Sequence, residues 1–494
     1  MTSMEEEEAL LAATSTEKHG GGDEEESLVL REIKKQLYLA GPLVVGFLLI
    51  NAIQMVSLMF VGHLGELALS SASMATSFAG VTGFSLMVIK RALTSLSPEW
   101  RAGLDTLCGQ AYGAGQHHQL GVYKQRAMLV LALVSVAVAA VWTCTGEILA
   151  WCGQDPEIAA GAGSYIRRLI PALFVYGALH CHIRFLQTQN LVLPVMLSSG
   201  ATALCHPAVC WLMVRRLGLG VNGAALANTV SYLTNLSIMA LYVRLSPSCK
   251  RSWTGFSAEA FRGIPDFLKL AVPSAFMVCM EWWSFELLVL LSGLLPNPKL
   301  ETAVLSICLN TNSLAFMAPL ALGAAISTRV SNELGAGRPQ AARLATRVVM
   351  LMALTVGVLE GLVVLLLRNL WGHAYSDEEE VTSYIARMMP VIAVSILLDS
   401  QQCVLSGIVR GCGRQKTGAF INLAAYYLVG NPMAFVFAFV CHLRGMGLWF
   451  GILCALVVQM LLLLSIILCT NWNQEALKAK DRVFSSNLPL DMTA

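Results

Sequence analysis

The sequence predicts an all-α integral membrane protein whose twelve transmembrane helices form two six-helix lobes. Three observations lead to this prediction. The chain of 494 residues is 56% hydrophobic and only 13% charged, whereas average proteins carry about 25% charged residues. Apolar runs of about 20 residues, the length that crosses hydrocarbon as a helix, recur along the chain. Motifs of the first half also return in the second half, as an internal repeat requires.

The predicted spans follow one another with short polar connections, which is typical of a multi-pass protein. They cover residues 36–61, 70–89, 121–146, 160–185, 190–214, 222–245, 266–295, 303–328, 341–367, 382–409, 416–441 and 446–470.

The ends of the chain differ from this apolar body. Residues 1–32 contain two acidic clusters, few large apolar residues and a run of three glycines. Such a segment buries too little apolar surface to fold, so we expect a disordered acidic tail. It also lacks the basic start and apolar centre of a cleavable signal peptide. We expect one lobe over 33–250, a second over 251–475, and a cytosolic tail over 476–494.

Basic residues are distributed unevenly between the two sides that twelve spans define. Of the 33 Lys and Arg residues, eight fall on one side, and the other 25 fall on the side of both termini. Because basic loops stay in the cytosol, both termini are expected there.

The internal repeat supports the two lobes directly. The segment "LDTLCGQAYGAG" from Leu104 matches "ISTRVSNELGAG" from Ile326, and "YIRRLIPALFVY" from Tyr165 matches "YIARMMPVIAVS" from Tyr384. Each half has an even number of spans in the same order, so an axis along the membrane normal should relate the lobes. A substrate path between them is then expected.

Several function classes are disfavoured by the sequence. The segment "GCGRQKT" at 411–417 lacks the spacing of a phosphate-binding loop, so ATP hydrolysis is not expected. The 14 cysteines are scattered through apolar spans, and His180 and His182 point about 160° apart on a helix. No metal, cofactor, enzymatic activity or nucleic-acid partner is therefore predicted.

Ionisable residues inside the spans are the main candidates for function, because each is costly in hydrocarbon. Glu281 lies near the middle of span 7, which makes it a candidate proton carrier, with a structural hydrogen bond as the alternative. Glu286 is about 140° further round the helix, and for this residue a functional role and a structural hydrogen bond are equally favoured. Asp399 in span 10 is predicted to be functional, whereas Glu360, near the end of span 9, is predicted to be structural or interfacial.

Aromatic and amide side chains complete the candidate site. Trp282 and Trp283 directly follow Glu281, and indole faces near a carboxylate suit an organic cation. Gln402 in span 10, with Asn51 and Gln54 in span 1, are further candidates for the lining of a substrate cavity.

A resemblance adds to this interpretation. The segments that carry it are "VGHLGELALSSASMATSFAGVTGFSL" from Val61, "LDTLCGQAYGAGQ" from Leu104, "RFLQTQNLVLP" from Arg184, "EWWSFELLVLLSGLLPNPKLETAVLSICLNT" from Glu281, "STRVSNELGAG" from Ser327 and "VLSGIVRGCGRQK" from Val404. Together they resemble the multidrug and toxic compound extrusion (MATE) family, in particular its plant DETOXIFICATION branch, over about residues 30–475.

The resemblance implies a twelve-helix, two-lobe antiporter that exports xenobiotics and secondary metabolites. It also implies that Glu281 and Asp399 are the proton-linked acids of the second lobe, and that Glu286 and Glu301 match further acidic positions of the wider family. Protons are the expected coupling ion, and sodium is the less favoured alternative. Small organic substrates such as organic cations, alkaloids or flavonoids, a monomeric state, and a vacuolar or plasma membrane location are expected.

One segment departs from the resemblance. Plant relatives join span 2 to the LDTLCGQA motif through a short Gly-Met-Ala-Ser junction, whereas "IKRALTSLSPEWRA" occupies residues 89–102 in this chain. Pro42 to Gly113 is 71 residues and the matching Pro273 to Gly335 is 62, so the repeat independently indicates an insert of about nine residues. A retained intron or misplaced exon boundary is favoured over a regulatory loop. The alternatives to an active antiporter are therefore an inactive splice or gene-model variant, a lipid flippase of related architecture, and a membrane scaffold.

Overall fold

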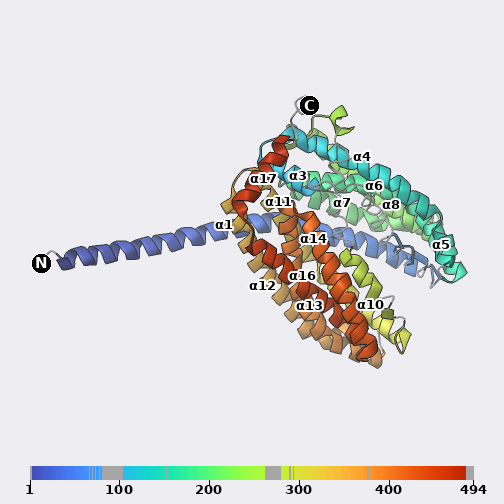
Figure 1. The fold of residues 1–494 in the computed structure, drawn as a ribbon. Helices are drawn as coiled ribbons and strands as arrows, with labels where there is room; N and C mark the ends of the chain where they lie inside the picture. The colour runs from blue at the N-terminus through green and yellow to red at the C-terminus, as the bar shows by residue number, and fades with distance from the viewer. Residues whose placement is uncertain are drawn as a thin grey trace, which may run out of the picture.

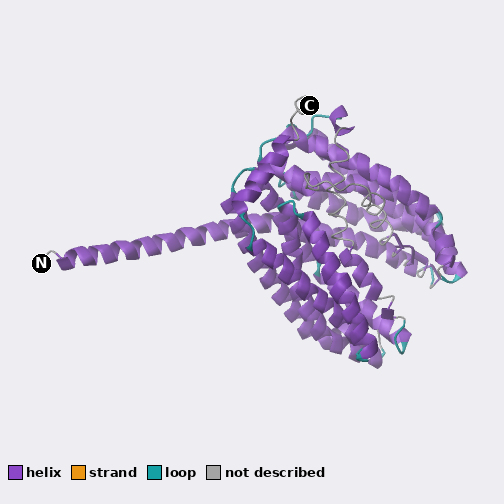
Figure 2. Ribbon diagram, in the orientation of Figure 1, coloured by secondary structure: helices purple, strands orange, loops and turns teal. Residues whose placement is uncertain are grey.

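The computed structural model describes residues 3–485, apart from 66, 69–70, 73, 77, 80–103, 152, 262–279, 289–290, 293 and 375–377. Over these residues the regular structure is helical throughout (Figure 2). The insert predicted at 89–102 lies outside the described residues.

The first lobe is built from a consecutive series of helices. They are α1 (Ser3–Gly62), α3 (Leu104–Gly113), α4 (His117–Thr143), α5 (Thr145–Trp151), α6 (Pro156–Thr188), α7 (Leu193–Cys210) with the π-helical turn η1 (Trp211–Arg216), and α8 (Gly220–Leu245). Two short 3-10 turns, η2 (Pro247–Cys249) and η3 (Ala258–Phe261), lead toward the second lobe.

The second lobe repeats this order. Residues 280–288 are helical. After them come α10 (Pro298–Ala315), α11 (Met317–Gly335), α12 (Pro339–Trp371), η4 (Gly372–Ala374), α13 (Glu379–Gly411), α14 (Gln415–Asn422), η5 (Leu423–Gly430), α15 (Asn431–Phe435), η6 (Val436–Val440), α16 (Arg444–Leu468) and α17 (Trp472–Ser485).

The predicted all-α membrane fold of two six-span lobes is confirmed. Nine of the described helices are long and apolar enough to cross a bilayer, and α10 with α11 forms a further span that bends by 40°. Each of these ten coincides with a predicted span. The other two predicted spans, 70–89 and 266–295, fall wholly or partly on residues outside the described ranges.

The ends of the long helices follow from local sequence. Asp155 caps α6 by accepting from the backbone N–H of Glu157 at 2.9 Å, and Pro156 occupies the first turn, where no backbone donor is needed. Beyond the other end of α6, Asn190 has a φ of 61°, and beyond α13, Gly413 has a φ of 79°. A left-handed residue after a helix turns the chain back, so both helices end in the same way.

The two lobes meet at the end of the molecule that carries α17, which we call the α17 face. Figure 1 shows the lobes side by side near α17 and separating toward α5 and α10. At the α17 face a Cβ on Gly113 would overlap the carbonyl oxygen of Asn332, and one on Gly335 would overlap the carbonyl oxygen of Gln110. We call this backbone-to-backbone contact the α3–α11 seam. Only glycine allows two helices to approach so closely.

The first helix includes most of the segment for which the sequence predicts a disordered tail, residues 1–32. Residues 3–62 form one helix, α1, whose first part extends away from the lobes (Figure 1). Glu32 is 4% exposed, and its carboxylate accepts two hydrogen bonds from Arg329 of α11, at 3.1 and 2.9 Å. Glu, Ala and Leu favour helix, and a buried ion pair fixes the end of this segment, which composition alone did not reveal.

The connection between the lobes is fixed to the first lobe. Gln125 of α4 donates to the carbonyl of Gly255 at 2.7 Å and accepts from the N–H of Ser257 at 2.8 Å. The ammonium of Lys124 lies 4.1 Å from the ring centre of Trp253, and Lys124 itself is fully buried. Residues 251–257 therefore pack with the first lobe, beyond the boundary predicted at residue 250.

Candidate functional site

One amide group joins the two predicted acids of the second lobe. The Gln402 Nε2 group donates to Glu281 Oε1 at 2.8 Å and to Asp399 Oδ1 at 3.1 Å. Asn312 Nδ2 donates to the other oxygen of Asp399 at 3.0 Å. Ser406 donates to Gln402 Oε1 at 3.3 Å, which orients the amide so that its nitrogen faces the acids. We call Glu281, Asp399, Gln402 and Asn312 the acid cluster.

Three helical segments position the acid cluster. Asp399 and Gln402 are three residues apart on α13, so they lie on one face of that helix. Asn312 lies one turn before the 40° bend between α10 and α11, and Glu281 lies in the helical segment 280–288. Asp399, Gln402 and Asn312 are buried, whereas Glu281 is partly exposed.

A second polar network lies among α14, η5 and α16. Buried Tyr426 donates to Gln459 Oε1 at 2.9 Å, and Gln459 Nε2 donates to Asn422 Oδ1 at 2.9 Å. Tyr426 lies in the π-helical segment η5, and π-helical turns in proteins often occur at functional sites. Ser284, one turn after Glu281, donates to Asn431 Oδ1 at 2.6 Å. These contacts join α14, η5 and α16 to one another, and the segment 280–288 to α15.

The structure groups some of the predicted site residues and separates others. Glu281, Asp399 and Gln402 come together. The side chain of Glu286 is exposed, Trp282 is 48% exposed, and Trp283 is partly exposed. Gln54 donates to Tyr232 within the first lobe at 3.1 Å, and Asn51 is partly exposed on α1. Among the polar contacts of the described residues, none of these five joins the acid cluster.

Glu301 lies in a separate structural contact. Its Oε2 accepts from Tyr384 at 2.8 Å and from the backbone N–H of Gly445 at 3.1 Å. A Cβ at position 445 would lie 2.5 Å from the same oxygen, so a larger residue there would displace the Glu301 carboxylate. Glu301 therefore ties α10 to α13 and α16 and lies outside the acid cluster.

The first lobe has a buried polar cluster of different chemistry. Ser57 of α1 lies 2.9 Å from His206 Nε2 and donates to Asn228 Oδ1 at 2.8 Å, and His206 Nδ1 lies 2.7 Å from Ser231. No carboxyl group takes part in these contacts of the described residues. Within the described part of the chain, the polar contacts pair two acids in the second lobe, although both lobes share the repeat.

Sequence reasoning missed Asn312, Tyr426, Gln459 and Asn422. The sequence does carry a signal for Asn312, because "LNTN" at 309–312 interrupts an apolar run. An uncharged amide costs less in a membrane than a carboxylate, so it attracts less attention in a search for ionisable residues.

The fold and the cluster together define a class of protein, a multi-pass membrane transporter with two repeated lobes and paired acids within one of them. Comparison with known proteins specifies the family. The MatE family model matches residues 42–212 and 273–436. The chain is 55% identical over 461 residues to Protein DETOXIFICATION 16 and 52% identical over 459 residues to Protein DETOXIFICATION 17, both from Arabidopsis thaliana. Each alignment covers 93% of this chain, with 93% and 94% of the respective relative.

Solved structures agree with this family. The crystal structure of the eukaryotic MATE transporter AtDTX14 is 45% identical, with a TM-score of 0.86 over 92% of this chain and all of that chain. A Vibrio cholerae MATE transporter, VcmN, shares the fold at 17% identity, with a TM-score of 0.75 over 93% of this chain and all of that one. The chain belongs to the MATE family of efflux transporters, as the motif resemblance indicated.

Proposed function

We propose that this protein is a proton-coupled antiporter that exports small organic compounds by alternating access. The observation that carries this proposal is the sharing of the Gln402 amide by Glu281 and Asp399. Two carboxyl groups around one donor form a place where a proton changes both charge and hydrogen bonding. Family membership supplies the efflux activity to which this proton site is coupled.

The coupling follows from the geometry of the acid cluster. When both acids are ionised, the N–H groups of Gln402 and Asn312 hold α10, α13 and the segment 280–288 together. A proton on either carboxyl group replaces an acceptor by a donor and weakens one of these bonds. The packing of three helices then changes, and the balance between the two transport states shifts. Substrate bound between the lobes shifts it back.

The direction of transport depends on which face lies in the cytosol. We assign the α17 face to the cytosol because it lies on the side with 25 of the 33 basic residues. The lobes are in contact at that face through the α3–α11 seam, as a state closed toward the cytosol requires. Protons enter from the apoplast or the vacuolar lumen, and the protein acts as a monomer.

The substrate class follows from the partly exposed aromatic and acidic side chains of the second lobe. Trp282, Trp283 and Glu281 lie within three consecutive residues and are all at least partly exposed. The two indoles lie about 100° and 200° round the helix from Glu281, so they offer stacking surfaces separate from the carboxyl group. Aromatic faces bind flat organic cations, so alkaloids and synthetic cations are the favoured substrates, and flavonoids follow by stacking. A lipid flippase of related architecture is the second candidate.

Reconstituted vesicles test this function. Purified protein is placed in liposomes with a pH gradient, and movement of a fluorescent organic cation is followed together with internal pH. We expect cation movement that needs the gradient, and proton movement when cation is added without one. Proton-independent movement of a labelled lipid, with no cation transport, would instead establish the flippase.

A further inference from the structure

The α17 face contains two interactions that the repeat relates to each other. Gln110 and Asn332 occupy the same position in the matching segments that begin at Leu104 and Ile326. Gln110 of the first lobe donates to the carbonyl of Gly411, at the end of α13, at 3.4 Å. Asn332 of the second lobe donates to the carbonyl of Thr188, at the end of α6, at 3.2 Å. Each lobe thus caps a long helix of the other, directly beside the α3–α11 seam.

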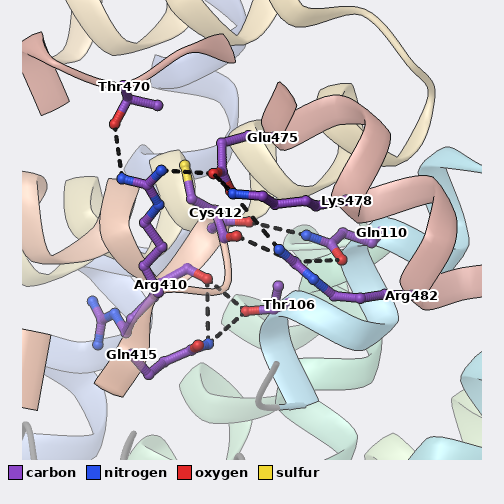
Figure 3. A network of polar contacts seen from close by, with 11 residues as sticks. Thr106, Gln110, Arg410, Cys412, Gln415, Thr470, Glu475, Lys478 and Arg482 are labelled. Carbon is purple, nitrogen blue, oxygen red and sulfur yellow. Dashed lines mark hydrogen bonds and ion pairs between the residues drawn. The ribbon is translucent and has the colours of Figure 1, made fainter. Parts of the chain in front are cut away.

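The C-terminal helix α17 adds a further contact at the same place. Arg482 Nη1 donates to Gln110 Oε1 of the first lobe and to the carbonyl of Cys412 of the second lobe, both at 3.2 Å (Figure 3). Gln110 therefore donates with its nitrogen to the second lobe and accepts with its oxygen from α17. One guanidinium group joins both lobes at the seam.

Glu475 attaches α17 to the second lobe. Its side chain is 1% exposed and accepts from Arg414 at 2.6 Å and from Lys478 at 3.0 Å, with Arg482 Nη2 at 3.8 Å (Figure 3). Burial opposes its ionisation, but the hydrogen bonds and charges of Arg414 and Lys478 outweigh that cost and lower the pKa of Glu475 below its ordinary value. An ionised carboxylate thus fixes the base of α17 while Arg482 reaches the seam.

We propose that α17 is a latch that holds the lobes together at the α17 face, with Arg482 as the residue that crosses the seam. Separation of the lobes there requires the Gln110 to Gly411 and Asn332 to Thr188 bonds to break, and Arg482 stabilises the first of them by fixing the Gln110 amide. The latch favours the state that is closed at this face. This inference rests on the proposed alternating-access function, because only a transporter needs this face to open.

The test compares two substitutions in the full-length protein that remove the same charge from the same helix. Arg482→Gln removes the contact across the seam. Lys478→Gln is the matched control, because Lys478 is 56% exposed, pairs among the described residues only within its own helix, and leaves Glu475 bound to Arg414 at 2.6 Å. Two readouts are measured in lipid nanodiscs, namely hydrogen exchange of the seam peptides 104–113 and 327–337, and maleimide labelling of buried Cys412 beneath α17.

We expect Arg482→Gln to raise seam exchange and Cys412 labelling by about tenfold, the factor for losing a charge-assisted hydrogen bond. Lys478→Gln should change both by less than about twofold, as for an exposed ion pair. If labelling rises while seam exchange stays at the wild-type rate, α17 is a peripheral helix and the latch is wrong. Unchanged readouts in both variants overturn it as well.

A second variant covers the case in which Arg482→Gln does not fold. Arg482→Lys keeps the charge but has a single ammonium group, which lacks the fork that reaches Gln110, Cys412 and Glu475 together. Seam exchange should then rise by a smaller factor, and a wild-type rate contradicts the latch. Neither readout involves protons or substrate. A failed vesicle assay would therefore contradict the proposed antiport, whereas seam exchange and Cys412 labelling would still test the latch.

Discussion

Glu281 and Asp399, which are 118 residues apart in sequence, accept hydrogen bonds from the same nitrogen, Gln402 Nε2, at 2.8 and 3.1 Å. The charge of one acid is therefore coupled to the hydrogen bonding of the other through a single buried group. The hydrogen bond from Asn312 distinguishes the two acids, because it is made to Asp399. This asymmetry gives separate expectations for the two acids.

Glu281→Gln should abolish pH-driven efflux while the protein expresses at nearly the wild-type level. The amide has a similar volume to the carboxyl group and keeps an oxygen that accepts from Gln402, but it cannot take up a proton. Transport in vesicles with a pH gradient is the measurement, with Glu286→Gln as the matched control on the same helical segment. Undiminished proton-coupled efflux in Glu281→Gln would remove this residue from the coupling role.

Asp399→Asn should also lose proton-driven transport, with a change in substrate preference. Its side chain accepts from two amide groups, Gln402 and Asn312, so the neutral variant weakens contacts to both α10 and the rest of the cluster. Efflux of a panel of organic cations is measured at several external pH values. Transport with an unchanged pH dependence would show that Asp399 has a structural role only.

The acids were predictable from sequence, whereas their arrangement was not. A carboxyl group in an apolar run is conspicuous because its cost in hydrocarbon is high. The bridging role of Gln402 depends on the packing of α13 against the segment 280–288, two elements whose bridged residues, Gln402 and Glu281, are 121 positions apart. For Glu286, the sequence gives the angle from Glu281 round the helix, but it does not show that the side chain of Glu286 is exposed and lies outside the acid cluster.

The ends of the lobes were less predictable for a related reason. The polar neighbours of Glu32 predict an unfolded tail, whereas its carboxylate pairs with Arg329 of the second half. Likewise, Lys124 and Gln125 of α4 fix the connection beyond residue 250. The ends of the ordered segments depend on single ion pairs and hydrogen bonds between residues far apart in the sequence. Amino-acid composition does not reveal such contacts.

Glu475→Gln should lower the protection of α17 against hydrogen exchange, and the difference from wild type should depend on pH. The variant loses an ionised acceptor of two hydrogen bonds, which is worth about 2 kcal/mol for a charge-assisted contact. The pKa of Glu475 is lowered in the folded protein. Its stabilising contribution is therefore complete above the ordinary value of 4.5 and is lost as the pH falls through the lowered value.

The measurement is hydrogen exchange of the α17 peptide in wild type and Glu475→Gln from pH 7 downward, corrected for the intrinsic rate. The difference in protection should stay constant to about pH 5 and shrink below it. Glu259→Gln, which removes an exposed carboxylate with 57% side-chain exposure, is the control and should leave α17 unchanged. A difference that grows toward low pH would contradict this assignment.

The last prediction concerns residues 89–102, which lie outside the described residues. Replacing this segment with Gly-Met-Ala-Ser should give a protein that expresses better and transports at least as well as the full-length chain. The segment contains three basic residues, one acid and a proline, and it directly follows the apolar run of span 2. Charged side chains are costly in hydrocarbon, so we expect their removal from the end of span 2 to favour insertion.

The repeat supports the length of this replacement, because the matching distance in the second half is nine residues shorter and the replacement removes ten. Helix α3, whose Gly113 forms the α3–α11 seam with Gly335, begins at Leu104, two residues beyond the replaced segment. Shortening the segment should therefore leave the seam intact, and surface expression, cation efflux and seam exchange are compared for the two proteins. A control insert of Gly and Ser residues, equal in length to segment 89–102 and placed at the same point, separates length from sequence. If the shortened protein loses activity while the full chain transports, the segment is a working loop, and the interpretation as a misplaced exon boundary is wrong.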